Sequence, residues 1–332
     1  MTTSNGYTFE LDENVERTPV RFKNRYGIEI AGDLYLPKNV PGKLPALALS
    51  GPFGAVKEQS SGLYANEYAR RGYAALAFDP SFTGESGGEV RDVASPDIYT
   101  EDFSAAVDFL GRLDLVDRER IGLHAICGLS GMALTAAAAD TRIKAVATSS
   151  MYDMSRSMSR SYQDSYTPEQ RHEVVDHLSR QRWADVDSGT FARGLHEVPF
   201  DEDGHLITAG TLFPETLPED PNPVLARFFE YYRTERGSHP RSINSTTAWT
   251  ATTPQAFFAF PLMANIDLLT RPALLVAGAD AHSRYYSEDV HATAPDTTEL
   301  LIVPDADHVD LYDRKDLIPF DRLDEFFTKN LA

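Results

Sequence analysis

Residue types that can act together in nucleophilic catalysis occur along this chain. Its one cysteine, Cys127, follows the apolar run Ile121 to Ile126 and directly precedes an alanine-rich segment. A strand that turns sharply into a helix lifts the residue at the turn above the sheet and aims the next backbone N–H at a developing oxyanion. His308 lies in a loop after the last apolar run, where its ring can take the proton of a thiol. We therefore predict that Cys127 is a nucleophile and that His308 is its base.

A carboxylate is expected to orient this histidine and to stabilise its charged form. Asp280 follows the apolar run that ends at Ala277, and we take it as the first candidate. Asp153 follows the preceding apolar run and is the alternative, while Glu288 is a more remote one. The spacing leaves the choice between these carboxylates open.

Two serines could compete with Cys127 as the nucleophile. Ser86 lies in Gly84-Glu85-Ser86-Gly87-Gly88, which matches the pattern Gly-x-Ser-x-Gly. That pattern indicates a nucleophile only where a strand turns into a helix, and this segment lies beyond its strand with no apolar helix after it. Ser130 would require the strand to continue through Gly128 and Leu129. We therefore favour Cys127 over both serines.

The overall charge restricts the partners that this chain can bind. The chain has 332 residues with 50 Asp+Glu against 31 Lys+Arg, a formal net charge of −19. Such a chain repels phosphate backbones and anionic lipids unless a basic patch compensates, and the sequence contains no such patch. We therefore expect a small-molecule acyl substrate and neither a nucleic-acid nor a membrane partner. The sequence is also compatible with a homodimer.

Metal ligation and secretion are not expected either. One cysteine can form neither an intramolecular disulfide nor a multi-thiolate metal site. His172 and His177 are five residues apart, which places them on different faces of a helix. The amino terminus lacks a basic segment followed by an apolar stretch, and no apolar run approaches the ~18 residues that span a bilayer. These features predict a cytoplasmic protein without a metal or cofactor.

The elements that must position these residues follow from the apolar runs. A hairpin is predicted over residues 20–36, followed by buried parallel strands alternating with helices. The predicted strands cover residues 46–49, 74–78, 121–126, 145–147, 273–277 and 299–303, and the predicted helices cover residues 97–112, 129–140 and 316–330. More than a hundred residues separate the fourth and fifth of these strands, which is too many for a loop. We therefore predict a core over residues 1–151 and 266–332 with a helical cap over residues 152–265, including helices at 167–185 and 221–235.

Several segments resemble the α/β-hydrolase superfamily, in particular its dienelactone-hydrolase-like members, in which cysteine can replace serine at the turn. The resemblance covers the chain from about residue 20 to the carboxyl end, apart from the cap. Its segments are the strand, turn and helix at 121–147, the loop Ser50-Gly-Pro-Phe-Gly-Ala-Val-Lys-Glu-Gln59 and the glycine-rich loop at 78–88. More distantly, Asp33-Leu-Tyr-Leu-Pro37 and the pair Lys57-Glu58 are similar to fungal polyketide transferases.

This resemblance implies an α/β-hydrolase fold, with a mostly parallel central sheet, helices on both faces and an inserted helical cap. It also implies an oxyanion hole formed by the backbone N–H of Gly128 and that of Phe53 or Gly54. The turn departs from the usual Gly-x-nucleophile-x-Gly, because Leu129 stands at the last position. Its local shape should therefore differ from that of the relatives.

Aromatic residues of the cap and of the segment after it suggest a pocket. Trp249, Phe257 and Tyr285 are the candidates to line an apolar acyl site. Together these features predict an acyl hydrolase that cleaves an ester, lactone or thioester through an acyl-cysteine. Two alternatives remain at this stage: an acyltransferase or lactone-forming cyclase that passes the acyl group to an alcohol or amine, and an inert binding protein.

Overall fold

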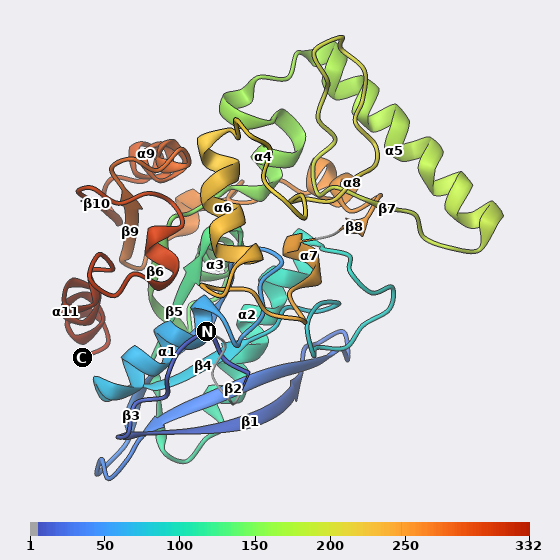
Figure 1. Cartoon of the computed structure of the whole chain (residues 1–332). Helices are drawn as coiled ribbons and strands as arrows, with labels where there is room; N and C mark the ends of the chain where they lie inside the picture. The colour runs from blue at the N-terminus through green and yellow to red at the C-terminus, as the bar shows by residue number, and fades with distance from the viewer. Residues whose placement is uncertain (1–5, 247) are drawn as a thin grey trace.

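An eight-stranded mixed sheet runs through the centre of the computed structural model, which describes residues 6–246 and 248–332 (Figure 1). In spatial order its strands are β1 (Val15–Lys23), β2 (Glu29–Pro37), β4 (Ala74–Phe78), β3 (Leu44–Ser50), β5 (Val116–Ile126), β6 (Ile143–Ser149), β9 (Ala273–Gly278) and β10 (Thr298–Val303). β1 and β2 form the predicted antiparallel hairpin, and β2 pairs antiparallel with β4. The pairs from β4 to β10 are parallel, which confirms the predicted sheet.

Helices cover both faces of this sheet because its strands are apolar on both sides. In β3, Ala46 and Ala48 belong to one core, and Leu47 and Leu49 belong to the other. The first core contains residues of α2 (Pro96–Gly111) and α3 (Ser130–Ala139), and the second contains residues of α1 (Ser60–Arg70) and α11 (Phe320–Asn330). This arrangement is the α/β-hydrolase architecture that the sequence predicted.

Helices separated by long loops make up the interval between β6 and β9. It contains α4 (Met154–Arg160), α5 (Pro168–Ser188), α6 (Pro223–Arg233), α7 (Ile243–Thr246) and α8 (Pro254–Ala259), and the short antiparallel pair β7 (Arg193–Gly194) and β8 (Trp249–Thr250). In Figure 1, α5 extends outward from the rest of the molecule. The helices predicted at 167–185 and 221–235 correspond to α5 and α6, while the division into core and cap at residues 152 and 265 stays a prediction.

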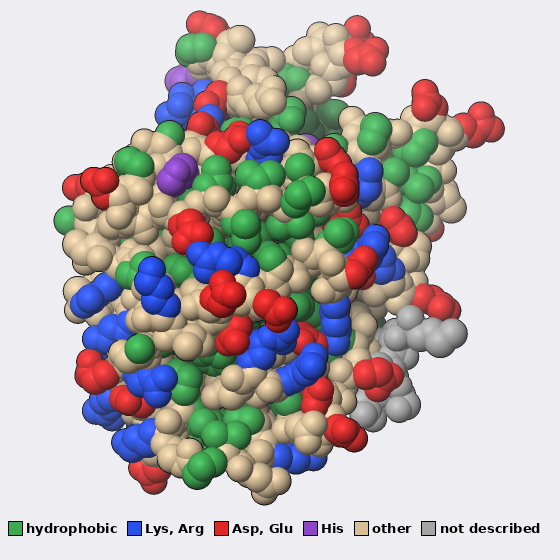
Figure 2. All heavy atoms as spheres, turned by 90° about the vertical axis from the view of Figure 1, so that its left-hand side faces the viewer, with side chains coloured by type: hydrophobic (Ala, Val, Ile, Leu, Met, Phe, Trp, Pro, Cys, Tyr) green, Lys and Arg blue, Asp and Glu red, His purple; other side chains and the backbone are tan. Residues whose placement is uncertain are grey.

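The surface and the ends of the chain add two observations. On the face seen in Figure 2, basic side chains lie among acidic ones, so the negative charge is not gathered in one area of that face. Within the described residues, no helix is both long and apolar enough to cross a bilayer. Residues 1–5, part of the amino terminus for which no leader is predicted, lie outside the described residues.

The loop after β3 comes very close to the end of β5. Gly51 has a φ of +103°, and a Cβ atom added there would lie 2.2 Å from the carbonyl oxygen of Ile126. Any side chain at this position would therefore push the loop away from the residue that precedes Cys127. This close approach places residues 52 and 53 beside the thiol.

Gly51→Ala is expected to lower the free energy of unfolding by roughly 3 kcal/mol, because a steric clash adds to the strain of a positive φ. Gly72→Ala is the matched control, since Gly72 has a φ of +98° and an added Cβ would meet no atom within 4 Å. That control should lose only about 1–2 kcal/mol. Urea unfolding measures both, and equal losses would contradict the account of the close approach.

Candidate functional site

Cys127 occupies the turn between β5 and α3. It begins a single 3-10 turn that ends at Leu129, and α3 starts at the next residue. Cys127 has a φ of +56° and is only 7% exposed. Residues other than glycine rarely adopt a positive φ, because it is strained. Residues with such strain concentrate at functional sites, where the surrounding structure holds them in place. The turn thus projects one thiol from the carboxyl end of the central strand.

Two backbone N–H groups surround this thiol. The N–H groups of Phe53 and Gly128 both lower the pKa of Cys127 and so favour its thiolate. Gly128 has no side chain, and an added Cβ would lie 2.6 Å from the Cβ of Phe53. Gly54 instead packs against the backbone of Asn244 and Ser245. Of the two predicted loop donors, the structure therefore brings Phe53, and not Gly54, to the thiol.

Cys127 is nevertheless a neutral thiol at neutral pH. Burial is the largest effect on its pKa and raises it above the ordinary value. The hydroxyl of Tyr312 and the N–H groups of Phe53 and Gly128 lower the pKa but offset burial only in part. The thiol must therefore lose its proton to a base when it attacks.

His308 is completely buried beside this turn. Its Nε2 lies 2.9 Å from the hydroxyl of Tyr312, and its Nδ1 lies 2.6 Å from the Oγ of Ser283. Burial, with a smaller contribution from His282, lowers the pKa of His308 well below its ordinary value. The ring is therefore neutral at neutral pH, and one of its two nitrogens can accept a proton.

Neither predicted carboxylate lies against His308. Asp280 is exposed, and no hydrogen bond or ion pair of its carboxylate with His308 occurs among the described residues. Asp153 is half-buried and caps α4 by accepting the N–H of Arg156 at 3.0 Å. Glu288 forms an ion pair with Arg284 at 2.8 Å. The expectation of a carboxylate partner is corrected, because Ser283, just before α9 (Arg284–Thr293), turns inward where Asp280 faces water.

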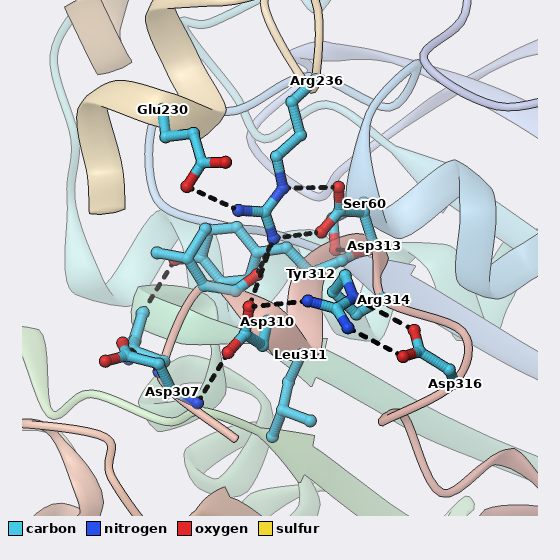
Figure 3. Close-up of polar contacts among 12 residues, drawn as sticks. Ser60, Glu230, Arg236, Asp307, Asp310, Leu311, Tyr312, Asp313, Arg314 and Asp316 are labelled. Atoms are coloured by element: carbon cyan, nitrogen blue, oxygen red, sulfur yellow. Dashed lines mark hydrogen bonds and ion pairs between the residues drawn. The ribbon is translucent and has the colours of Figure 1, made fainter. Parts of the chain in front are cut away.

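The segment that carries His308 and Tyr312 is anchored by ion pairs (Figure 3). Arg236, which follows α6, binds both carboxylate oxygens of Asp313 in α10 (Asp310–Asp313) at 2.7 and 2.8 Å. Arg227 of α6 pairs with Asp307 at 2.8 Å. Because bidentate and charge-assisted bonds fix geometry well, these contacts tie the position of His308 to that of the cap.

Core residues hold the same segment from the other side. Ser60 donates its hydroxyl to the carbonyl oxygen of Tyr312 at 2.9 Å, and Tyr64 donates to that of Leu311 at 2.7 Å. Ser150, after β6, donates to the carbonyl oxygen of His308 at 2.8 Å. The imidazole and the phenol are therefore held by both the core and the cap.

Cys127 opens into a cavity of about 220 Å³. The residues that line it are Phe53, Cys127, Tyr152, Met154, His196, Glu197, Leu212, Phe213, Phe228, Tyr232, Ser245 and Tyr312. Six of them are aromatic, and the rings of Phe213, Phe228 and Tyr232 are nearly parallel, with interplanar angles of 12–18°. Such a lining suits a flat apolar group bound next to the thiol.

The aromatic residues predicted to line the pocket lie behind it. Trp249 stacks on Phe53 with ring centroids 4.4 Å apart, and Phe257 meets Phe53 edge to face at 6.1 Å. Tyr285 stacks on Tyr286 at 4.1 Å in α9. None of the three belongs to the cavity lining: Trp249 and Phe257 pack behind Phe53, and Tyr285 packs on a residue outside the lining. The cause is the position of Phe53, whose ring stands between the cavity and Trp249.

A buried ionic cluster supports the loop that carries Phe53. Lys57 is 3% exposed and pairs with Glu58 and with Glu85, the latter at 2.7 Å. Its backbone N–H donates to Asp79 at 2.7 Å. Burial raises the pKa of Asp79 to about 7, while Lys57 opposes that shift. The Lys57-Glu58 pair, noted in the sequence for its resemblance, therefore lies beneath the oxyanion loop and does not reach the thiol cavity.

The serines and histidines that were considered besides Cys127 do not come together in a second site. Ser86 is buried and donates to the carbonyl oxygen of Asp79 at 2.6 Å, and Ser130 donates to that of Ala125 at 3.2 Å. His172 and His177 lie on α5, and within the described parts of the chain no group of three or more His, Cys, Asp or Glu side chains is arranged to hold a metal ion. Cys127 thus remains the candidate nucleophile.

Sequence reasoning missed Ser283 and Tyr312, the two hydroxyls that contact the His308 ring. Tyr312 stands four residues after His308, a spacing that brings side chains together once the chain turns helically. Ser283 stands five residues after the end of β9 and carries no comparable signal. Only the tertiary structure identifies it as the partner of Nδ1.

Ser283→Ala is expected to lower kcat/KM about 10-fold, because it removes one hydrogen bond that orients the His308 ring. Asp280→Asn should change kcat/KM less than about 2-fold, since an exposed side chain without contact to His308 contributes little. Steady-state hydrolysis of an activated ester by both variants measures this. A larger loss in Asp280→Asn than in Ser283→Ala would restore the carboxylate as the partner.

Comparison with known proteins identifies the family of this chain. The profile of the X-Pro dipeptidyl-peptidase (S15) family matches residues 26–197, just over half of the chain. The uncharacterized protein PA2218 of Pseudomonas aeruginosa is 54% identical over 326 residues, covering 98% of this chain and 83% of that protein. Its crystal structure superposes with a TM-score of 0.90 over 99% of this chain and 98% of that one, at 53% identity.

More distant relatives match a smaller part of the chain or the fold alone. Thiohydrolase aneE of Aspergillus aculeatus is 34% identical over 136 residues, covering 40% of this chain and 42% of that protein. Acyltransferase drtE of Aspergillus calidoustus is 31% identical over 104 residues, covering 31% and 34%. The α/β hydrolase GrgF from Penicillium sp. sh18 is 20% identical, with a TM-score of 0.75 over 96% of this chain and 99% of that one.

The family profile covers the strand, turn and helix around Cys127 as well as β2 and the loop of Phe53. The predicted superfamily is therefore confirmed, while the narrower dienelactone-hydrolase-like kind stays a prediction. A hydrolase-type enzyme agrees with the fold and with the relatives, which sets the inert binding protein aside. The chain belongs to the X-Pro dipeptidyl-peptidase (S15) family and is an enzyme of the α/β-hydrolase superfamily.

Proposed function

We propose that this enzyme is an acyl hydrolase that cleaves a small ester, lactone or thioester through an acyl-cysteine intermediate at Cys127. One observation carries the proposal: the Cys127 thiol stands at a strained turn, faces two backbone N–H groups and opens into an aromatic cavity. A thiol with oxyanion donors already in place is equipped for acyl transfer. Cys127 lines the cavity, so a substrate bound in the cavity would contact the nucleophile.

In the first half of the reaction, the thiol loses its proton to neutral His308 as its sulfur attacks the carbonyl carbon. The electron pair of the carbonyl double bond moves to oxygen, and the N–H groups of Phe53 and Gly128 bind the resulting oxyanion. Removal of one such donor in comparable enzymes costs about 2.7–4 kcal/mol of transition-state stabilisation. Collapse of the intermediate breaks the bond to the leaving group, which takes the proton from His308, and leaves the acyl group on sulfur.

In the second half, water gives a proton to His308 and attacks the thioester carbon. The same two N–H groups bind the second oxyanion, and collapse breaks the bond between sulfur and carbon. The carboxylic acid leaves, and the thiol regains the proton. Tyr312, whose hydroxyl lies 2.9 Å from Nε2 of His308 and which lines the cavity together with Cys127, supports this assignment of nucleophile and base.

A transfer reaction is the second candidate function. The intermediate is a thioester in a cavity lined largely by aromatic rings, which limits water near it. An alcohol or amine bound there would take the acyl group in place of water. The names of the relatives aneE, a thiohydrolase, and drtE, an acyltransferase, agree with either outcome. The product ratio with and without an added alcohol separates hydrolysis from transfer.

The size of the cavity predicts a preference for small acyl groups. Its volume of about 220 Å³ is below the ~300–1,000 Å³ of sites for drug-sized ligands. The p-nitrophenyl esters of acetate, butyrate and benzoate are expected to have kcat/KM values at least about 10-fold above that of the dodecanoate, because a twelve-carbon chain does not fit in this volume without displacing the side chains that line it. A kcat/KM that rises steadily with chain length would contradict this.

Phe213→Ala is expected to shift this preference toward longer chains, since Phe213 lines the cavity and its removal enlarges it. Phe200→Ala is the matched control, because Phe200 packs in a separate small core with Val174 and Leu178. The ratio of kcat/KM values for hexanoate and acetate measures the shift. An equal shift in both variants would mean that the effect comes from lost stability and not from the cavity.

Cys127→Ala is expected to lower kcat/KM for p-nitrophenyl acetate at least about 10³-fold, because it removes the attacking atom. Ser130→Ala removes a hydroxyl only three residues away and should stay within about 3-fold of the parent enzyme. Steady-state rates, with circular dichroism to confirm folding, provide the measurement. The same two variants tested on an X-Pro amide would show whether the activity in the family's name uses the same residue. Unchanged ester hydrolysis in Cys127→Ala would refute the proposal.

A further inference from the structure

The hydroxyl of Tyr312 lies between the thiol and the imidazole. It is 2.9 Å from Nε2 of His308, and it lines the same cavity as Cys127 and lowers the pKa of that thiol. Within the described residues, no hydrogen bond joins the sulfur of Cys127 directly to His308. The expected direct pair of thiol and histidine is therefore replaced by a chain of three groups.

We infer that Tyr312 is a catalytic residue that relays the proton of Cys127 to His308, and that Ser283 orients the receiving ring. The inference rests on the proposed function, because it describes how the nucleophile of that reaction is activated. Tyr312 also lines the cavity, so its hydroxyl can approach a bound substrate. It is buried and held at its carbonyl oxygen by Ser60, which fixes the ring between its two partners.

The relay conserves protons at each step. Before attack, the thiol S–H donates to the oxygen of Tyr312, and the O–H of Tyr312 donates to Nε2 of His308. As the bond between sulfur and the carbonyl carbon forms, the thiol proton moves to the phenol oxygen while the phenol proton moves to Nε2. The phenol is neutral before and after, and the charges formed are the oxyanion and the imidazolium. When the leaving group departs, Nε2–H of His308 returns its proton to the phenol oxygen, while the phenol gives its own proton to the leaving-group atom, because the sulfur is now acylated.

The surroundings of Tyr312 favour a relay over a stable phenolate. Burial is the largest of the effects that raise the pKa of Tyr312 well above its ordinary value. An isolated phenolate would therefore be costly here, whereas passing one proton while receiving another avoids it. The neutral imidazole and the neutral thiol at the two ends fit the same picture.

The geometry also explains how a histidine without a carboxylate partner can serve. Ser283 Oγ lies 2.6 Å from Nδ1. In the tautomer that the relay uses, Nδ1–H donates to this oxygen and Nε2 is the acceptor for Tyr312. The ring position is fixed further by Ser150, which donates to the His308 carbonyl oxygen at 2.8 Å. Orientation thus comes from hydroxyl groups, and the imidazolium exists only during the reaction.

Tyr312→Phe tests the relay, since phenylalanine keeps the ring and removes only the bridging hydroxyl. The expected result is a loss of kcat/KM of about 100-fold, within the range of general acid–base contributions. Tyr231→Phe is the matched control, because the Tyr231 ring packs against that of Tyr312 at 5.1 Å and Tyr231 is not part of the cavity lining. The control should retain activity within about 3-fold, and thermal unfolding of both variants reports on packing.

A proton inventory of the acylation step distinguishes catalysis from positioning. The rate is measured in mixtures of H₂O and D₂O with a substrate whose acylation is rate-limiting. Two protons in flight give a curved dependence on deuterium fraction for the parent enzyme, whereas Tyr312→Phe should give a linear one. A linear dependence in the parent, or a Tyr312→Phe variant that keeps both its rate and a curved dependence, would overturn the relay.

Failure of the relay and failure of the proposed function give different results. If Cys127→Ala loses activity while Tyr312→Phe keeps it, the acyl-cysteine stands and the proton reaches His308 by another route. If Cys127→Ala keeps its activity, the acyl-cysteine itself is wrong. The two variants therefore separate the two claims in one assay.

Discussion

The candidate site depends on the close approach of two backbone segments, residues 51–53 and residues 126–128. Only glycine fits at both contact points, since an added Cβ at Gly51 would lie 2.2 Å from the Ile126 carbonyl oxygen and one at Gly128 would lie 2.6 Å from the Phe53 Cβ. The contact brings two N–H groups to one thiol and holds Cys127 at a φ of +56°. Core packing on both faces of the sheet fixes the segments, so the strain at one residue is supported by the whole fold.

Charge is arranged differently at this site from the rest of the molecule. The chain has a net charge of −19, yet the groups that contact the His308 ring are two hydroxyls and not a carboxylate. Charged residues act at a distance from the reaction, through the pairs of Arg236 with Asp313 and Arg227 with Asp307. A buried site whose thiol, phenol and imidazole are neutral favours a proton that moves only as the nucleophile attacks. The interval between β6 and β9 supplies part of the cavity wall and, through Arg227 and Arg236, supports the histidine segment.

The sequence allowed prediction of the fold far better than of the site. The buried strands, the hairpin and the position of Cys127 follow from local patterns of apolar residues and from a strand that leads into a helix. The partners of His308 could not be read in the same way, because Asp280 and Ser283 are three residues apart in one loop and only packing decides which turns inward. The aromatic lining was missed for a similar reason. Phe53 separates Trp249 from the cavity, and no local pattern indicates which ring lies in front.

The central claim is that the acyl group is carried by Cys127, and one measurement tests it most directly. The enzyme is mixed with excess p-nitrophenyl benzoate, quenched in acid during turnover, digested, and analysed by tandem mass spectrometry. The account predicts a benzoyl group on the sulfur of the peptide that contains Cys127, removed by neutral hydroxylamine as a thioester would be. A benzoyl group on a serine-containing peptide, with Cys127 unmodified throughout turnover, would contradict it.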